Sequence, residues 1–418
     1  MKTGIAYTTK DSILLLCITF FFYNIIGNGY ILLLISILPI VMKLLNNLKK
    51  KAACPYAWVF FIIAIMFSSA FSLASSKTNN FLFLSIIIFI IKIVLDNEQD
   101  WQGYFIKMVV IFAAINVVAT LISEMFPEVM TSYARKVFSG EALDIYMSLF
   151  NNGAYPGVNG QTSINGYFIS LFIAYMVSEI ITNPHKVLNY ILLGFSVIAL
   201  FMTNKRSFLL GNIIASGILF LTNIMSDKHK SRNLIIFVAV IVIVYLIFKY
   251  NSAANGVLKK MKALEESGDI SNGRMTYWEY TYKIFKSFSL FGIGAASLEY
   301  TYGISTHNVY LQVLAEMGIY GFIVFIVFML LSLKCSYKTY ADMVEHNCGN
   351  ERVISGMALY MQVLFVVYCF FGNPLYGINF VIPYMMATSV SKSYSNLIQS
   401  TRGDELDENR DINIPQHS

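Results

Sequence analysis

The segment FLFLSIIIFIIKIVL, Phe81 to Leu95, is apolar except for one serine and one lysine. With its flanking residues it approaches the roughly 20 residues that a helix needs to cross a membrane. Its apolar residues are continuous rather than alternating, which indicates a helix and argues against a membrane β-barrel. The chain of 418 residues is 56% hydrophobic and 13% charged. A soluble protein could not bury so much apolar surface, so the sequence predicts an all-α polytopic membrane protein.

Apolar runs of similar length recur along the chain, and we expect about twelve transmembrane helices. They lie near residues 12–27, 29–43, 56–75, 79–95, 104–123, 162–182, 187–203, 207–226, 233–250, 308–333, 353–372 and 375–391. The first run has no small-residue cleavage site after it, so we interpret it as a span rather than a removed signal peptide.

Positive charges predict the orientation of these spans, because Lys and Arg are enriched in cytoplasmic loops. With the N-terminus in the cytoplasm, the inner loops receive most of the basic residues, whereas the short outer turns hold only Lys77 and the pair Lys205–Arg206. Both termini are therefore expected in the cytoplasm. The net charge of +6 mostly reflects this bias and does not indicate nucleic-acid binding. None of the five cysteines falls in an outer loop, so no disulfide framework is expected.

The predicted topology divides the chain into transmembrane and loop segments. They are N-terminal spans at 1–123, a periplasmic loop at 124–161, central spans at 162–250, a large periplasmic loop at 251–306, C-terminal spans at 307–391 and a cytoplasmic tail at 392–418. The tail contains RGDELDENRD, residues 402–411, whose charge predicts disorder. Long loops usually carry function, so we expect the chemistry on the outer face.

The segment MTNKRSFLLG, Met202 to Gly211, places Lys205 and Arg206 at the outer boundary, against the charge bias. One interpretation is that these cations only anchor the chain at the membrane surface. The other is that Arg206 binds a phosphate in a bidentate manner.

The segment SNGRMTYWEYTYKIFKSF, Ser271 to Phe288, follows a turn signal with Arg274, Tyr277 and Trp278 at positions i, i+3 and i+4. We expect an amphipathic helix on the membrane surface, whose apolar face is formed by Ile284, Phe285 and Phe288. Arg274 either stacks on the aromatic rings of its own helix or, oriented by them, binds an anionic headgroup.

The segment STHNVYLQVLAEMGIYGF, Ser305 to Phe322, places His307 at the mouth of a span. Ser305 or Thr306 is expected to cap the helix. The positive end of the helix dipole then disfavours a charged imidazole, which leaves the neutral base form of His307 populated.

A polar stripe follows in the same helix, formed by Asn308, Gln312 and Glu316. At 1.5 Å per residue, Glu316 lies about 12 Å below Asn308, a depth at which a carboxyl needs a partner. The alternative is a polar helix–helix contact, with Gly318 and Gly321 allowing close packing. The sequence shows no zinc-ligand spacing and no nucleotide-binding glycine loop. Cations on the outer face favour an anionic lipid-linked substrate there.

The segments TNKRSFLLG, NGRMTYWEY, LFGIG and THNVYLQVLAEMGIYG occur here in the order seen in bacterial O-antigen polymerases and O-antigen ligases. The chain resembles this family over residues 162–322. The resemblance implies a glycosyltransferase of the inner membrane that acts at the periplasmic face on undecaprenyl-pyrophosphate-linked oligosaccharides. It implies no metal and no cofactor. A chain-length regulator and a flippase of the same pathway are candidate partners beside the membrane lipids.

The resemblance also implies roles for particular residues. Arg206 and Arg274 fall where the family binds pyrophosphate, and His307 falls on the family's histidine. These three are the candidate catalytic residues. Further candidate substrate-binding residues are their neighbours Lys205, Tyr277, Trp278, Asn308 and Glu316.

A polymerase and a ligase use the same donor and differ in the acceptor, which is another lipid-linked repeat or the lipid A-core. The turn FGIG, Phe291 to Gly294, favours a polymerase, with a ligase as the alternative. A flippase for the lipid-linked glycan is a third, non-enzymatic hypothesis, which would require charged residues through many spans.

Overall fold

The computed structural model describes residues 9–26, 56–98, 100–226, 234–235, 238, 242 and 273–412. Within these ranges the protein is helical and contains no strand, as the sequence predicts. The helices that form the bundle are α1 (Thr9–Ile26), α3 (Tyr56–Ser69), α4 (Ser75–Asn97), α5 (Gln102–Met125), α8 (Thr162–Thr182), α9 (Val187–Met202), α10 (Arg206–Ser226), α15 (Val309–Glu345), α16 (Gly349–Tyr368) and α17 (Ile378–Ile412).

Six of the described helices are long and apolar enough to cross a membrane: α4, α5, α8, α10, α15 and α16. Shorter apolar helices are α3, α9 and part of α1. The expected span at 29–43, most of that at 233–250 and the loop at 251–272 lie outside the described residues. The structure thus supports a membrane protein with several spans, while the number twelve stays a prediction.

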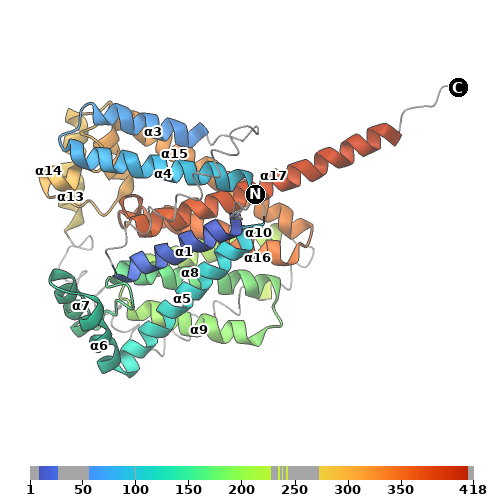
Figure 1. Cartoon of the computed structure of the whole chain (residues 1–418), viewed down its shortest axis with the longest axis horizontal. Coiled ribbons are helices and arrows are strands. Elements are labelled where there is room, and N and C mark those ends of the chain that lie inside the picture. Colours follow the sequence, from blue (N-terminus) through green and yellow to red (C-terminus); the bar gives the residue numbers. More distant parts are fainter. Residues whose placement is uncertain are drawn as a thin grey trace, which may run out of the picture.

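Two helices form the centre of the bundle. The spans α8 and α16 are each 89% buried, whereas α4, α5, α10 and α15 bury about half of their spans. The central helix α16 packs against α8, α10, α15 and α17, which surround it (Figure 1). The outer helices therefore present their exposed apolar sides to the surroundings, as lipid-facing helices do.

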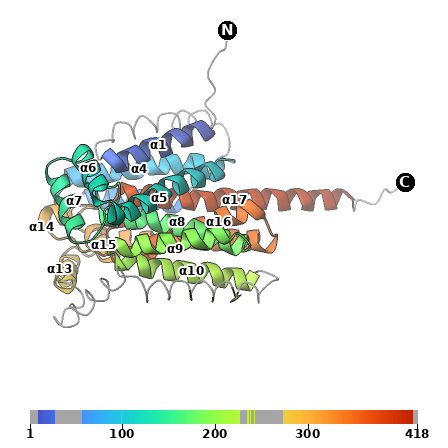
Figure 2. The same cartoon turned by 90° about the horizontal axis from the view of Figure 1, so that it is seen from below.

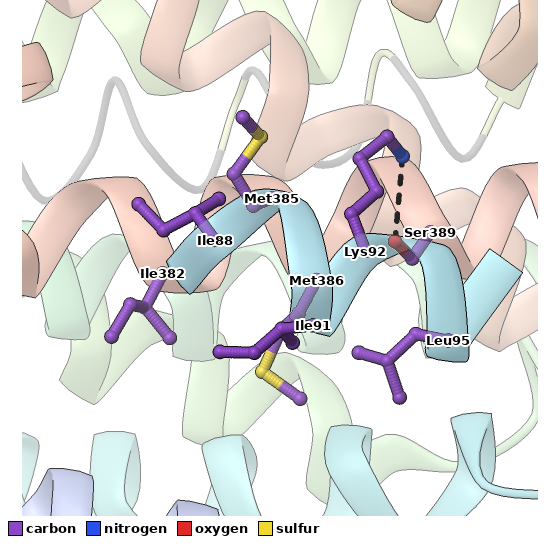
Figure 3. Close-up of a pocket in the computed structure, with 8 residues that line it drawn as sticks. All are labelled: Ile88, Ile91, Lys92, Leu95, Ile382, Met385, Met386 and Ser389. Atoms are coloured by element: carbon purple, nitrogen blue, oxygen red, sulfur yellow. Dashed lines mark hydrogen bonds between the residues drawn. The ribbon is translucent and has the colours of Figure 1, made fainter. Parts of the chain in front are cut away.

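A buried ion pair within α4 is hydrogen-bonded to α17 inside this bundle. The Lys92 Nζ atom lies 3.0 Å from Asp96 Oδ1 on the same helix and donates to Thr388 Oγ1, also at 3.0 Å, on α17. Figure 3 shows the Lys92 amine reaching Ser389, beside a small apolar pocket between the two helices. A buried charge needs such partners, so this contact fixes how α17 lies against α4.

Four short helices gather at one end of the bundle (Figures 1 and 2). They are α6 (Pro127–Val137), α7 (Glu141–Asn151), α13 (Arg274–Ser287) and α14 (Leu298–Tyr302). The first pair belongs to the loop predicted at 124–161, and the second pair to the loop predicted at 251–306. Two long loops that are distant in the sequence therefore meet at the same end.

The C-terminal end of α17 differs from the sequence prediction. The helix continues to Ile412 and projects away from the bundle, so residues 402–411 are helical rather than disordered (Figure 1). The charged composition predicts disorder because it offers no core, but a helix that extends from a packed span needs no separate nucleation.

The span α15 is broken at Gly318, whose φ of 65° and ψ of −170° interrupt the helix. A side chain there would meet the carbonyl oxygen of Leu290 at 2.2 Å. The break frees carbonyl groups that the neighbouring segment uses: Ile293 N donates to Ala315 O, and Gly294 N donates to Glu316 O at 2.9 Å. No broken span is predicted from the sequence. It is stable because the FGIG segment satisfies the freed backbone groups within the protein.

Candidate active site

The turn between α9 and α10 positions Lys205 and Arg206. Arg206 is the first residue of α10, and both side chains are partly exposed. The turn is attached to the loop at 124–161 by two hydrogen bonds: Asn204 Nδ2 donates to Gly153 O at 3.0 Å, and Tyr155 N donates to Met202 O at 3.1 Å. The two cations therefore lie where the sequence predicts, between two spans, and against an ordered loop.

Helix α13 begins at Arg274 because Gly273 adopts the left-handed conformation, with φ 81°, that the predicted turn requires. The helix confirms the predicted start but not the predicted surroundings. Its Ile284 is buried and packs with Ile293, Leu298 and Ala315. Phe285 is partly buried beside it, whereas Phe288 is exposed. The predicted apolar face of α13 is thus divided between the protein and the surroundings.

Arg274 contacts the connection that follows α16. One of its terminal nitrogens donates to the carbonyl oxygen of Phe371 at 3.4 Å, in the connection after α16. Tyr277, the residue at i+3, is exposed, whereas Trp278 is partly buried and donates from its indole nitrogen to Thr306 O at 2.9 Å. Trp278 therefore bonds to the chain segment before His307.

His307 lies just outside the span, with part of its side chain exposed, and its backbone is in the left-handed region with φ 49°. The predicted cap is wrong: Asn308 is the N-cap of α15, and its Oδ1 accepts from Leu311 N at 3.2 Å. The hydroxyl of Thr306 accepts from Asn308 N at 3.2 Å, on the far side of His307. These bonds bracket His307 and hold it in its unusual backbone conformation.

Electrostatic interactions link Lys205, Arg206, Arg274 and His307. Partial burial, followed by the positive charges of Arg274 and Lys205, lowers the pKa of His307. Partial burial, followed by the charge of Arg206, lowers the pKa of Arg274, while Tyr368 acts in the opposite direction. Arginine stays protonated in proteins, so the cluster carries positive charge beside a neutral imidazole at neutral pH.

Glu316 does not belong to this cluster, although the sequence places it among the substrate-binding candidates. It is fully buried, and its Oε1 accepts from Leu298 N at 2.9 Å and from Gln312 Nε2 at 3.1 Å. Its Oε2 accepts from Ala296 N at 2.8 Å. The partner that its depth demands is thus the N-terminus of α14, whose free amide groups favour a carboxylate.

Asn308 is also a poor candidate for substrate contact, because its side chain is buried and caps α15. The polar stripe predicted from Asn308 through Gln312 to Glu316 exists, but it faces the protein. Gln312 links Glu316 to Thr306, since its Oε1 accepts from the hydroxyl of Thr306 at 3.2 Å and its amide donates to Glu316. The alternative of a polar packing contact is therefore the better description of this stripe.

The connection between α16 and α17 contributes residues that the sequence prediction missed. Besides the Phe371 carbonyl, the Asn373 Nδ2 donates to Ser305 Oγ at 3.1 Å. Cys369 O accepts from Val309 N at 2.8 Å, at the start of α15. The Asn373–Pro374 dipeptide is a turn signal that would have marked this connection. Within the described ranges, no group of three His, Cys, Asp or Glu side chains is placed to hold a metal ion.

Known proteins were compared with the chain, including the segment that contains Arg206, Arg274 and His307. No curated protein matches the chain. The family model described as O-antigen ligase matches residues 191–326, a range that contains Arg206, Arg274 and His307. This part of the chain is therefore similar to the O-antigen ligase family.

Proposed function

We propose that the protein is an O-antigen polymerase, a glycosyltransferase that joins undecaprenyl-pyrophosphate-linked oligosaccharide repeats at the periplasmic face of the inner membrane. The proposal is supported chiefly by one observation: Arg274, whose helix is hydrogen-bonded to the turn of His307, interacts electrostatically both with Arg206 and with His307, although the three residues are far apart in the sequence. An anion with two phosphate groups fits such a cluster, because each guanidinium offers a planar pair of donors.

In the proposed reaction, His307 and the two arginines have different roles. A hydroxyl of the acceptor sugar attacks the anomeric carbon of the donor, and a new glycosidic C–O bond forms. The bond from that carbon to the pyrophosphate oxygen breaks, and undecaprenyl pyrophosphate leaves with its electron pair. The hydroxyl proton passes to the neutral imidazole of His307, whose lowered pKa keeps it unprotonated. Arg206 and Arg274 stabilise the charge that develops on the leaving oxygen.

The pyrophosphate linkage supplies the driving force, so the proposed reaction needs no soluble cofactor and no metal ion. Activity of the purified protein on a lipid-linked repeat should survive strong chelation. If chelation abolished turnover and magnesium or manganese restored it, the two arginines would not be sufficient to stabilise the leaving group.

Arginine-to-lysine variants test the proposed pyrophosphate site. Lysine keeps the charge but loses the planar pair of donors, so Arg206→Lys and Arg274→Lys should each lower polymer synthesis by about 10²–10³. His307→Ala should fail similarly at normal protein levels in the membrane. The matched control is Arg135→Lys on α6, an exposed arginine at the same end of the molecule, which should keep wild-type activity. Full activity of both lysine variants at the site would contradict the proposal.

A ligase is the second candidate, because the matching family model carries that description. The two functions predict different lipopolysaccharide after deletion of the gene. A lost polymerase leaves single repeats on the core, whereas a lost ligase removes O-antigen from the core while lipid-linked polymer accumulates. Gel electrophoresis of the lipopolysaccharide therefore distinguishes them. The chain-length regulator and the flippase of the same pathway are proposed partners in both cases.

A further inference from the structure

A single hydrogen bond links the helix of Arg274 to the turn of His307. The indole nitrogen of Trp278, one helical turn after Arg274, donates to the carbonyl oxygen of Thr306 at 2.9 Å. Building on the proposed function, we infer that Trp278 is a positioning residue, which holds the imidazole of His307 against the guanidinium of Arg274 and does not itself contact the substrate.

The conformation of His307 explains why its turn needs external support. A non-glycine residue with φ near 49° is in a strained backbone conformation. The hydrogen bonds that hold the flanking residues include those from Trp278 to Thr306 O, from Asn308 N to the Thr306 hydroxyl and from Val309 N to Cys369 O. The Trp278 bond is the one of these three that leads to α13.

The geometry forms a closed arrangement of three segments. Helix α13 bonds to the His307 turn through Trp278, and the turn bonds to the α16–α17 connection through Asn373 and Ser305. That connection bonds back to α13 through Phe371 O and Arg274. Because each segment contacts the other two, loss of the Trp278 bond should let the His307 turn move away from Arg274 without unfolding either helix.

Movement of His307 has a measurable consequence for its pKa. The charges that face the imidazole are Arg274 on α13 and Lys205 in the α9–α10 turn. Both disfavour the imidazolium, in addition to partial burial. A His307 that moves away from Arg274 should therefore titrate at higher pH, closer to the ordinary value for histidine, about 6.5.

The test compares Trp278→Phe with Trp101→Phe. The control removes the same kind of bond far from the site, because the Trp101 indole nitrogen donates to Leu95 O at 3.1 Å in the α4–α5 connection. Two measurements are made on the full-length protein. The first is kcat and KM on a lipid-linked repeat. The second is the pH dependence of His307 modification by diethyl pyrocarbonate, followed by mass spectrometry of its peptide.

Trp278→Phe is expected to lower kcat about three- to tenfold, as loss of one ordinary hydrogen bond implies, with KM changed less than about twofold. The pKa of His307 should rise in this variant and stay unchanged in Trp101→Phe. Asn373→Ala, which removes the bond to Ser305 on the other side of the turn, should raise it as well. This second variant keeps the test informative if Trp278→Phe does not accumulate.

Two results would overturn the inference. A higher KM at unchanged kcat would show that the Trp278 ring contacts the substrate, and an unchanged pKa of His307 in both site variants would show that the turn does not depend on these bonds. The pKa measurement uses no substrate, so it is independent of the proposed function. Full activity of the arginine and histidine variants described above would refute that function, whatever the titration shows.

Discussion

Replacement of Glu316 by glutamine distinguishes two roles for this residue. The sequence predicts that it binds substrate, whereas the structure indicates that it stabilises the fold. An amide oxygen at the Oε1 position can keep the bonds from Leu298 N and Gln312 Nε2, but the amide nitrogen then faces Ala296 N–H. A buried donor without an acceptor costs about 1–3 kcal/mol, and each retained bond loses roughly 1 kcal/mol with the charge. We therefore expect Glu316→Gln to destabilise the protein by about 4 kcal/mol.

The assay is thermal unfolding in detergent, followed by the loss of the monodisperse peak on gel filtration. The melting temperature of Glu316→Gln should fall by several degrees, because the backbone amides of Ala296 and Leu298, at the start of α14, depend on the carboxylate. At a temperature where the variant is folded, KM should stay near the wild-type value. The control is Glu299→Gln on α14, where the carboxylate is exposed. Wild-type stability of Glu316→Gln together with a raised KM would show that Glu316 binds substrate after all.

Three further predictions concern the break, the site and the topology. Gly318→Ala should be strongly destabilising, because the residue has positive φ and no room for a side chain, whereas Gly217→Ala has open space and should be tolerated in the same unfolding assay. The neutral form of His307 is the proposed base and its pKa is lowered, so activity in a pH–rate profile should fall only as the pH drops below about 6.5. Lys205→Ala removes a charge that lowers this pKa, so it should move the fall in activity to higher pH. A cysteine at Asn152, in a variant without native cysteines, should react with a membrane-impermeant thiol reagent added from the periplasm, and its protection in intact cells would reverse the proposed orientation.

The sequence alone was sufficient to predict the class of the protein and the bounds of its three central spans, whereas several other helices differ from the predicted spans by four residues or more. The span predicted at 162–182 is α8, and those at 187–203 and 207–226 differ from α9 and α10 by one residue. Such agreement is possible because the length of an apolar run and the charges at its ends are local properties. The start of α13 followed from the Asn272–Gly273 turn for the same reason.

Tertiary packing determines which polar residues lie at the site and which stabilise the fold. Glu316 and Asn308 lie on the helix that follows His307, and nothing local distinguishes a substrate ligand from a cap. Their partners, Ala296 and Leu298 in one case and Leu311 in the other, were identified only once the chain was folded. The bond from Trp278 to Thr306 spans 28 positions, and that from Arg274 to Phe371 spans 97. Contacts at such separations depend on how whole helices pack, and a periodic pattern within one helix carries no information about them.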